Sequence, residues 1–110
     1  MALDVRTGRA LQGNLTGGLS GPAIKPITLR LVWEAGRAVK IPKVELGGME
    51  TAKNVLDYMA VGAPAVQVGT ASFADPRASE VIAGGLAKAL SDVKALSFNG
   101  IRDRFLVENG

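Results

Sequence analysis

The sequence predicts an α/β fold with a parallel sheet. Its periodic segments alternate as helix, strand, helix, strand and helix between residues 24 and 90, which is the succession of βα units joined by right-handed crossovers. Both predicted strands are followed directly by glycine, and the 110 residues show no linker and no stronger repeat. We therefore expect one unit over residues 1–110 and no second domain.

The composition limits the chemistry that the chain can perform. The chain is 47% hydrophobic and 21% charged, with no cysteine and no histidine. Disulfides, thiolate metal sites, a cysteine nucleophile and a histidine base are therefore excluded. The net charge of +3 is scattered and the chain has five aromatic residues, which argues against nucleic-acid binding.

The apolar pattern also argues against a membrane protein. The longest mainly apolar stretch, residues 58–68, is broken by Gly62 and Pro64 and is too short to span a bilayer. The first residues contain an early acid, Asp4, and no apolar core, so they do not form a secretory signal. We expect a cytoplasmic location.

The first helix is predicted after an irregular N-terminal stretch. Residues 1–26 are interrupted by glycine and proline, with short strand pieces possible around residues 2–5. Apolar residues then recur at helical spacing over residues 24–39. Pro26 is compatible with a helix there because it lies in the first turn.

A strand and a second helix follow. Residues 41–46 have the pattern of a short strand that is entered through Pro42 and ended by Gly47-Gly48. Thr51 is a suitable N-cap for the second helix, and Gly62 is the natural residue to end it. The apolar side of this helix consists of Val55, Leu56, Met59 and Ala60.

The second strand and the remaining helices complete the pattern. Residues 65–68 predict a strand buried on both faces, followed by a loop over residues 69–75. Pro76 can open a third helix over residues 77–90, and residues 97–105 predict a short helix that is interrupted or started at Asn99-Gly100. The side of the third helix predicted to be apolar consists of Val81, Ile82, Leu86, Ala89 and Leu90.

Two glycine-bearing loops carry the strongest chemical signal. Gly47-Gly48 and Gly69-Thr70 each follow a predicted parallel strand, and the carboxyl ends of such strands are where α/β proteins bind ligands. Glycine lets the backbone approach a phosphate, and helix-initial amides donate to it. The alternative is that these glycines only make tight turns. Neither a dinucleotide-binding G-x-G-x-x-G motif nor a Walker A lysine is present.

Two segments resemble one family closely. Residues 16–26, Thr-Gly-Gly-Leu-Ser-Gly-Pro-Ala-Ile-Lys-Pro, and residues 66–71, Val-Gln-Val-Gly-Thr-Ala, resemble class 1 dihydroorotate dehydrogenases. The resemblance covers most of residues 1–90, and the opening nine residues look most like the NAD-linked subclass. It implies the C-terminal portion of a (β/α)₈ barrel, two to three βα units of a fold that takes about 250 residues.

The same resemblance implies a cofactor site. In this family the corresponding loops hold FMN, so the resemblance assigns Gly21, Gly47, Gly48, Gly69 and Thr70 to the cofactor, chiefly to its phosphate and ribityl end. Lys25 is interpreted as a structural cation behind that site. The base and most substrate-binding residues of the family lie upstream of this segment, so no catalytic residue is assigned in this chain.

The implied function is the FMN-binding portion of an enzyme that oxidises dihydroorotate to orotate in pyrimidine biosynthesis, inactive without the N-terminal half of the barrel. The implied partners are a complementing chain or further copies of this chain, and an iron–sulfur and FAD subunit. One alternative is an inactive half-barrel that self-associates or docks to a partner. Another is a different phosphate-binding barrel enzyme.

Two segments depart from the family pattern. Residues 43–46 are Lys-Val-Glu-Leu where the family has small or apolar residues. Glu45 would repel a phosphate if it faced the site without compensation from Lys43, and would have no such effect if it pointed away. Residues 91–110 also fit the family poorly.

Overall fold

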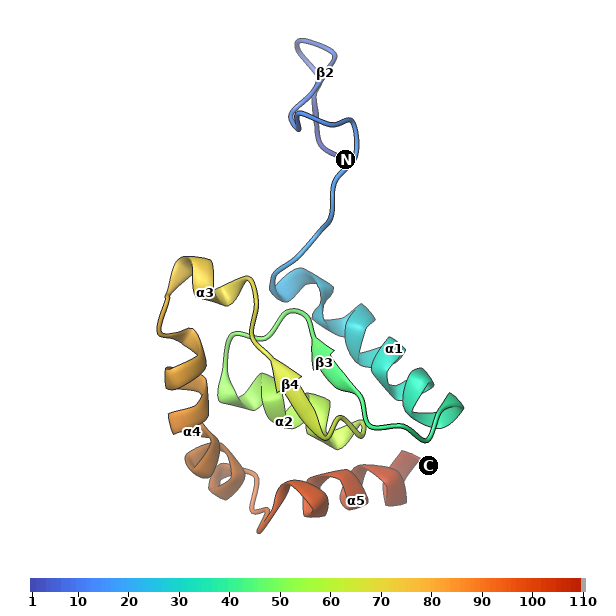
Figure 1. Ribbon diagram of the computed structural model, residues 1–110, viewed down its shortest axis with the longest axis vertical. Helices are drawn as coiled ribbons and strands as arrows, with labels where there is room; N and C mark the ends of the chain where they lie inside the picture. The colour runs from blue at the N-terminus through green and yellow to red at the C-terminus, as the bar shows by residue number, and fades with distance from the viewer. Residues whose placement is uncertain (110) are drawn as a thin grey trace.

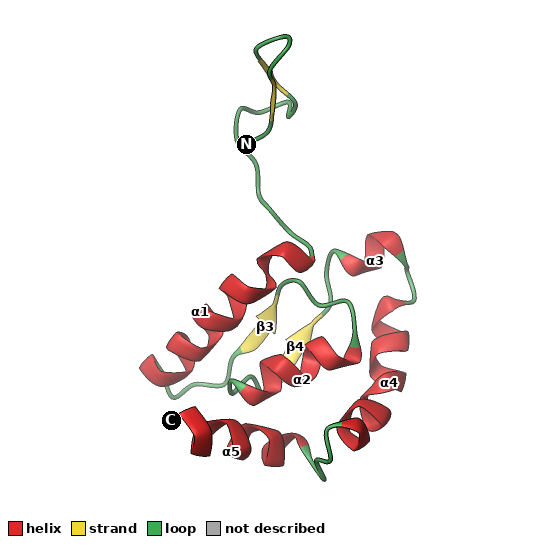
Figure 2. Cartoon of the chain, turned by 180° about the vertical axis from the view of Figure 1, so that it is seen from behind, coloured by secondary structure: helices red, strands yellow, loops and turns green. Residues whose placement is uncertain are grey.

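The computed structural model describes residues 1–109. A pair of short parallel strands, β3 (Val44–Leu46) and β4 (Ala65–Gln67), lies at the centre of the body, with helices around it (Figure 1). Helix α2 (Ala52–Ala60) lies across one face of this pair, in front of it in Figure 2 and behind it in Figure 1. The predicted α/β class and the parallel pairing are both confirmed.

The N-terminal residues form an arm that extends from the body (Figure 1). Strands β1 (Leu3–Asp4) and β2 (Arg9–Ala10) pair antiparallel at its tip, which confirms strand pieces near residues 2–5. Beyond this hairpin, residues 11–20 have no regular structure. The chain enters the body through a turn of 3₁₀ helix, η1 (Pro22–Ile24).

The first predicted helix is confirmed as α1 (Lys25–Ala38). Pro26 lies in its first turn, where the missing amide has no intrahelical partner to lose. Val32 is its fully buried residue. By contrast, the strand predicted at residues 41–46 begins only at Val44, because Pro42 has no amide to donate to a sheet.

The second helix has both of its predicted end signals. The Thr51 hydroxyl accepts from the Asn54 amide at 3.2 Å, and the Asn54 side chain accepts from the Thr51 amide at 3.1 Å, which forms a capping box. At the other end, Gly62 has φ of +104°. The amide of Ala63 then bonds back to the Tyr58 carbonyl at 3.0 Å.

The prediction that the second strand is buried on both faces is wrong. In β4, Ala65 and Gln67 are exposed and Val66 is half-buried, and β3 shows the same alternation. The register pairs Val44 with Ala65, Glu45 with Val66, and Leu46 with Gln67. Helix α2 therefore covers one face, and no element of residues 1–109 covers the other.

The segment after β4 contains more helix than predicted. The predicted loop over residues 69–75 holds a single helical turn, α3 (Ala71–Ala74). Helix α4 (Ala78–Asp92) begins one residue later than predicted, and Val81, predicted on its apolar side, is 58% exposed. Close packing explains the glycine at position 85, because a Cβ there would lie 3.3 Å from the Cβ of Ala52 in α2.

The last helix, α5 (Phe98–Asn109), is longer than predicted and Gly100 does not interrupt it. The Arg104 guanidinium donates to the carbonyls of Val93 and Lys94 at 3.1 and 3.2 Å, which ties α5 to the end of α4. Helix α5 packs against α2. None of the helices within residues 1–109 is long and apolar enough to cross a membrane.

One hydrophobic core lies on the covered side of the strand pair. It joins residues of α1, α2 and α4 to the loop after β3, and Val66 packs against it from the sheet. The buried members of this core are Val32, Met49, Val55, Tyr58, Ala63 and Ile82. This core fixes the positions of the two strands, and the loops that follow them form the candidate site.

Candidate functional site

The five residues predicted to bind a cofactor line one cavity. It has a volume of about 160 Å³ and lies where the loops after β3 and β4 meet the start of η1. The structure therefore brings Gly21, Gly47, Gly48, Gly69 and Thr70 together from three separate segments. The remaining lining residues are Ser20, Ile24, Leu46, Met49, Glu50 and Ala71.

Gly48 is the most constrained of these glycines. Its φ of +65° lies in the left-handed region. A Cβ at this position would lie 2.8 Å from the Lys25 Cβ and 3.0 Å from the Gly21 carbonyl oxygen. Any side chain would therefore push the loop after β3 away from the segment that opens α1, and the cavity between them depends on its absence.

The requirement for glycine is weaker at the other glycine positions of the cavity. Gly21 has φ of +90° and Gly47 has φ of +146°. A Cβ on Gly47 would meet the Thr28 hydroxyl oxygen at 3.0 Å, and one on Gly69 would meet Leu46 at 3.2 Å. Gly48 is therefore required both by its left-handed backbone conformation and by its close contacts. At position 21, glycine is required by the backbone conformation alone.

Backbone amides border the cavity. Among residues 1–109, no acceptor takes a hydrogen bond from the amides of Gly48 or Thr70, although both belong to lining residues. Amides of this kind are the donors that hold anions in α/β loops. The Thr70 side chain does not cap α3, so its hydroxyl also has no bond within that helix.

Tyr58 supports the glycine turn from the core side. This residue of α2 is completely buried, and its hydroxyl donates to the Gly47 carbonyl at 2.5 Å. Burial raises the pKa of the Tyr58 phenol above its ordinary value of 10.0, and the charges of Glu45 and Asp57 act in the same direction. Contact with the Thr28 hydroxyl acts in the opposite direction. The phenol is therefore protonated at neutral pH and can act as a donor.

The structure shows where the two charged residues discussed from the sequence, Lys25 and Glu45, lie. Lys25 forms an ion pair with Asp57 of α2, so it stands behind the turn as a structural cation. Glu45 is in register with Val66, on the side of the sheet that α2 covers. Glu45 is not among the residues that line the cavity, so Lys43 is not needed to compensate its charge there.

Sequence reasoning missed Glu50, which does line the cavity. Its backbone amide donates to the Asn54 side chain at 3.1 Å, so the capping box of α2 holds this residue in place. Its position two residues after the glycine pair and directly before the N-cap was the available signal. Ser20 and Met49 were also missed as lining residues, although both adjoin predicted glycines.

The cavity is suited to one end of a ligand. Pockets that enclose a whole small molecule have volumes of roughly 300–1,000 Å³, and this cavity is smaller. Within residues 1–109, no group of three or more acidic, histidine or cysteine side chains could hold a metal. A glycine-lined cavity with free amides at the ends of adjacent parallel strands is typical of α/β proteins that bind phosphorylated ligands.

The comparison with protein families agrees with this class. A model described as dihydroorotate dehydrogenase matches residues 1–90. The chain therefore belongs to the dihydroorotate dehydrogenase family, as the two segments around the glycines predict. The match ends within α4, so α5 lies outside it.

Individual relatives point to the NAD-linked subclass. The chain is 50% identical over 103 residues to a protein of Geotalea uraniireducens (strain Rf4) named dihydroorotate dehydrogenase B (NAD(+)), catalytic subunit, covering 94% of this chain and 32% of the relative. A protein of the same name from Geobacter sp. (strain M21) is 51% identical over 92 residues, covering 84% of this chain and 30% of the relative. The chain thus spans about a third of the length of these relatives.

Proposed function

We propose that this chain is the FMN phosphate-binding portion of a dihydroorotate dehydrogenase of the NAD-linked subclass. The observation that carries the proposal is the meeting of Gly21, Gly48 and Gly69 around one cavity bordered by amides without acceptors. The names of the relatives and the family membership supply the reaction, oxidation of dihydroorotate to orotate. In fold terms, residues 1–110 would be the last units of a (β/α)₈ barrel.

The residues present fit a phosphate ester at this position. A Cβ on Gly48 would push the loop after β3 away from Gly21 and Lys25, and glycine lets these two segments come together. The cavity holds a group the size of a phosphate and leaves the rest of a flavin outside it. Gly48 and Thr70 would donate through their amides, and the Thr70 hydroxyl would add a third donor. Bound FMN would supply the two-electron acceptor of the reaction.

This chain would bind and orient, and it would leave proton removal to another part of the barrel. We assign it no catalytic residue, because the family's base belongs to the portion that precedes this segment. That portion would also cover the open face of β3 and β4, where Val44 is 58% and Leu46 53% exposed. The word subunit in the relatives' names fits an additional iron–sulfur and FAD chain as partner, and we expect the assembly in the cytoplasm.

Titration with FMN tests the proposal directly. We expect saturable quenching of flavin fluorescence that inorganic phosphate reverses. The chain mixed with the preceding two thirds of the Geotalea uraniireducens relative should then reduce flavin when dihydroorotate is added. No saturable change up to high micromolar FMN, alone or in the mixture, would contradict the proposal.

The alternative of an inactive docking module rests on the open face of the strand pair. Its distinguishing result is association without flavin binding. Light scattering of the chain alone, with and without FMN, separates the two functions, because the docking module should form oligomers whether or not FMN is present.

A further inference from the structure

The buried hydroxyl of Tyr58 donates a hydrogen bond to a residue of the cavity. Tyr58 is the only tyrosine of the chain and is 0% exposed. Its hydroxyl donates to the carbonyl of Gly47, the first residue of the turn that lines the cavity. Helix α2 begins a few residues after this turn, at Ala52. The hydrogen bond therefore joins the helix to the loop that precedes it.

The direction of this hydrogen bond determines where the next amide points. The chain has no cis peptide bond within the described residues, so the Gly47 carbonyl and the Gly48 amide point in opposite directions. The carbonyl is directed into the core, toward Tyr58. The Gly48 amide therefore faces away from the core, and no acceptor within residues 1–109 takes its hydrogen bond.

A peptide between two glycines needs such a restraint. Neither Gly47 nor Gly48 has a Cβ, so rotation of the plane between them meets little steric resistance. A half-turn of this plane would exchange the two groups and aim the carbonyl oxygen where the amide now points. An anion in the cavity would then meet a negative dipole in place of a donor.

We propose that Tyr58 is a positioning residue for the anion-binding turn, holding the Gly47–Gly48 peptide with its amide toward the cavity. The inference rests on the proposed function, since it assigns Tyr58 to the same phosphate site. The neighbouring contacts support it. Thr28 and Ile24 of the adjoining segment lie 3.0 and 3.3 Å from where a Cβ of Gly47 would be, so they pack tightly against this residue, and the capping box fixes the far end of the loop.

The test replaces the hydroxyl and keeps the ring, in Tyr58→Phe of the full chain. We expect the dissociation constant for FMN to rise about three- to tenfold, as for the loss of one hydrogen bond. In ¹⁵N spectra without ligand, the Gly48 amide signal should shift or split, which reports the peptide orientation itself. Ile82→Val serves as the control, because it trims the core at α4 and should lower the unfolding midpoint without moving either readout.

The outcomes separate this inference from the proposed function. If the unmodified chain does not bind FMN, the proposed function fails, while the Gly48 signal still reports whether Tyr58 orients the turn. If the chain binds FMN but Tyr58→Phe changes neither the dissociation constant nor the Gly48 signal, the positioning role is wrong. An equal loss of affinity in Ile82→Val would assign the effect to general stability and would also overturn the inference.

Discussion

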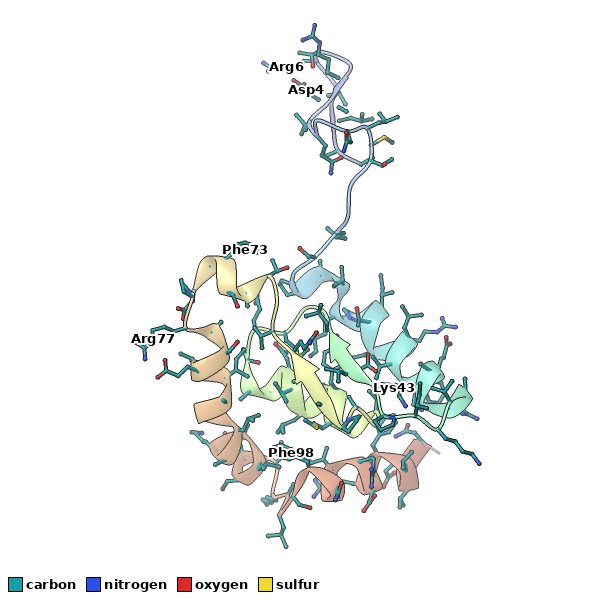
Figure 3. The ribbon with its side chains drawn as sticks, in the orientation of Figure 1. Asp4, Arg6, Lys43, Phe73, Arg77 and Phe98 are labelled. Atoms are coloured by element: carbon teal, nitrogen blue, oxygen red, sulfur yellow. The ribbon has the colours of Figure 1, made fainter. Side chains whose placement is uncertain are left out.

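The two faces of the β3–β4 pair are built from the same six residues, but one face is covered and the other is exposed. On the face that α2 covers, Val66 packs against the core and Glu45 is half-buried. On the other face, Val44 and Leu46 are more than half exposed. In Figure 3, side chains lie between the strand pair and the helices around it.

This difference bears on the proposed place of the chain in a larger barrel. The covered face supplies the stability that positions the loops, and the cavity lies at the end of the strands. Parallel sheets are normally covered on both faces. The open face is therefore the side on which the remaining two thirds of the relatives' length would pack.

The largest loss of stability is expected from a substitution in the core on the covered face. Ile82 is 5% exposed within the core, and Ile82→Ala should reduce the free energy of unfolding by about 2–5 kcal/mol. Leu46→Ala, on the open face, should cost less than about 1 kcal/mol because its side chain is already largely hydrated. Urea unfolding of both variants at one protein concentration measures the contrast, and equal losses would show that the open face is covered in solution.

The next largest effect on stability is expected at Gly48, where the loop after β3 lies against the segment that opens α1. Gly48→Ala combines a left-handed φ with contacts of 2.8 and 3.0 Å, and should cost about 2–4 kcal/mol and abolish FMN binding. Gly62→Ala is the matched control, because its φ is +104° but nothing lies within 4 Å of the added Cβ. It should cost only about 1–2 kcal/mol. The difference between the two unfolding free energies measures close approach alone, and its absence would contradict the packing argument.

The features that depend on neighbouring residues were predicted from the sequence, whereas those that depend on distant residues were not. The capping box at Thr51 and the turn at Gly62 are local, so spacing alone located α2. The burial of β4 was mispredicted because a run as short as residues 65–68, with Val66 and Val68, gives a similar signal whether one face or two are covered. The glycine pattern located the two loops of the cavity, and the resemblance added Gly21. The positions of Glu50 and Tyr58 depend instead on how α2 packs beneath the loop that precedes it, which no local pattern encodes.

A smaller effect is expected at the start of α2. Thr51→Ala removes the hydroxyl that accepts from the Asn54 amide and should cost about 1 kcal/mol. Thr70→Ala is the matched control, since Thr70 precedes α3 but its side chain makes no capping bond. Urea unfolding should leave Thr70→Ala within about 0.5 kcal/mol of the unmodified chain. A larger loss at Thr70 than at Thr51 would contradict the assignment of the cap.

Alkaline pH should lower the stability of the folded chain through Tyr58. Its folded-state pKa is raised above the unfolded value of 10.0, so the unfolded chain releases this proton at a lower pH than the folded chain. The contribution is therefore fully present below about pH 10 and is lost as pH rises through the folded pKa. Urea unfolding from pH 8 to 11 should show a steeper decline in the unmodified chain than in Tyr58→Phe. Parallel curves would contradict the burial of the phenol.

The smallest effect should come from the exposed carboxylate of the cavity. Glu50 lines the cavity and its side chain is in contact with solvent, so its repulsion of a bound phosphate is weakened by water and salt. Glu50→Gln should tighten FMN binding about two- to threefold at low salt, and the gain should shrink as salt rises. Glu108→Gln, in α5 at the opposite end of the strands (Figure 1), should leave the affinity unchanged. Fluorescence titration at two salt concentrations measures both, and weaker binding in Glu50→Gln would mean that this carboxylate holds the ligand instead of opposing it.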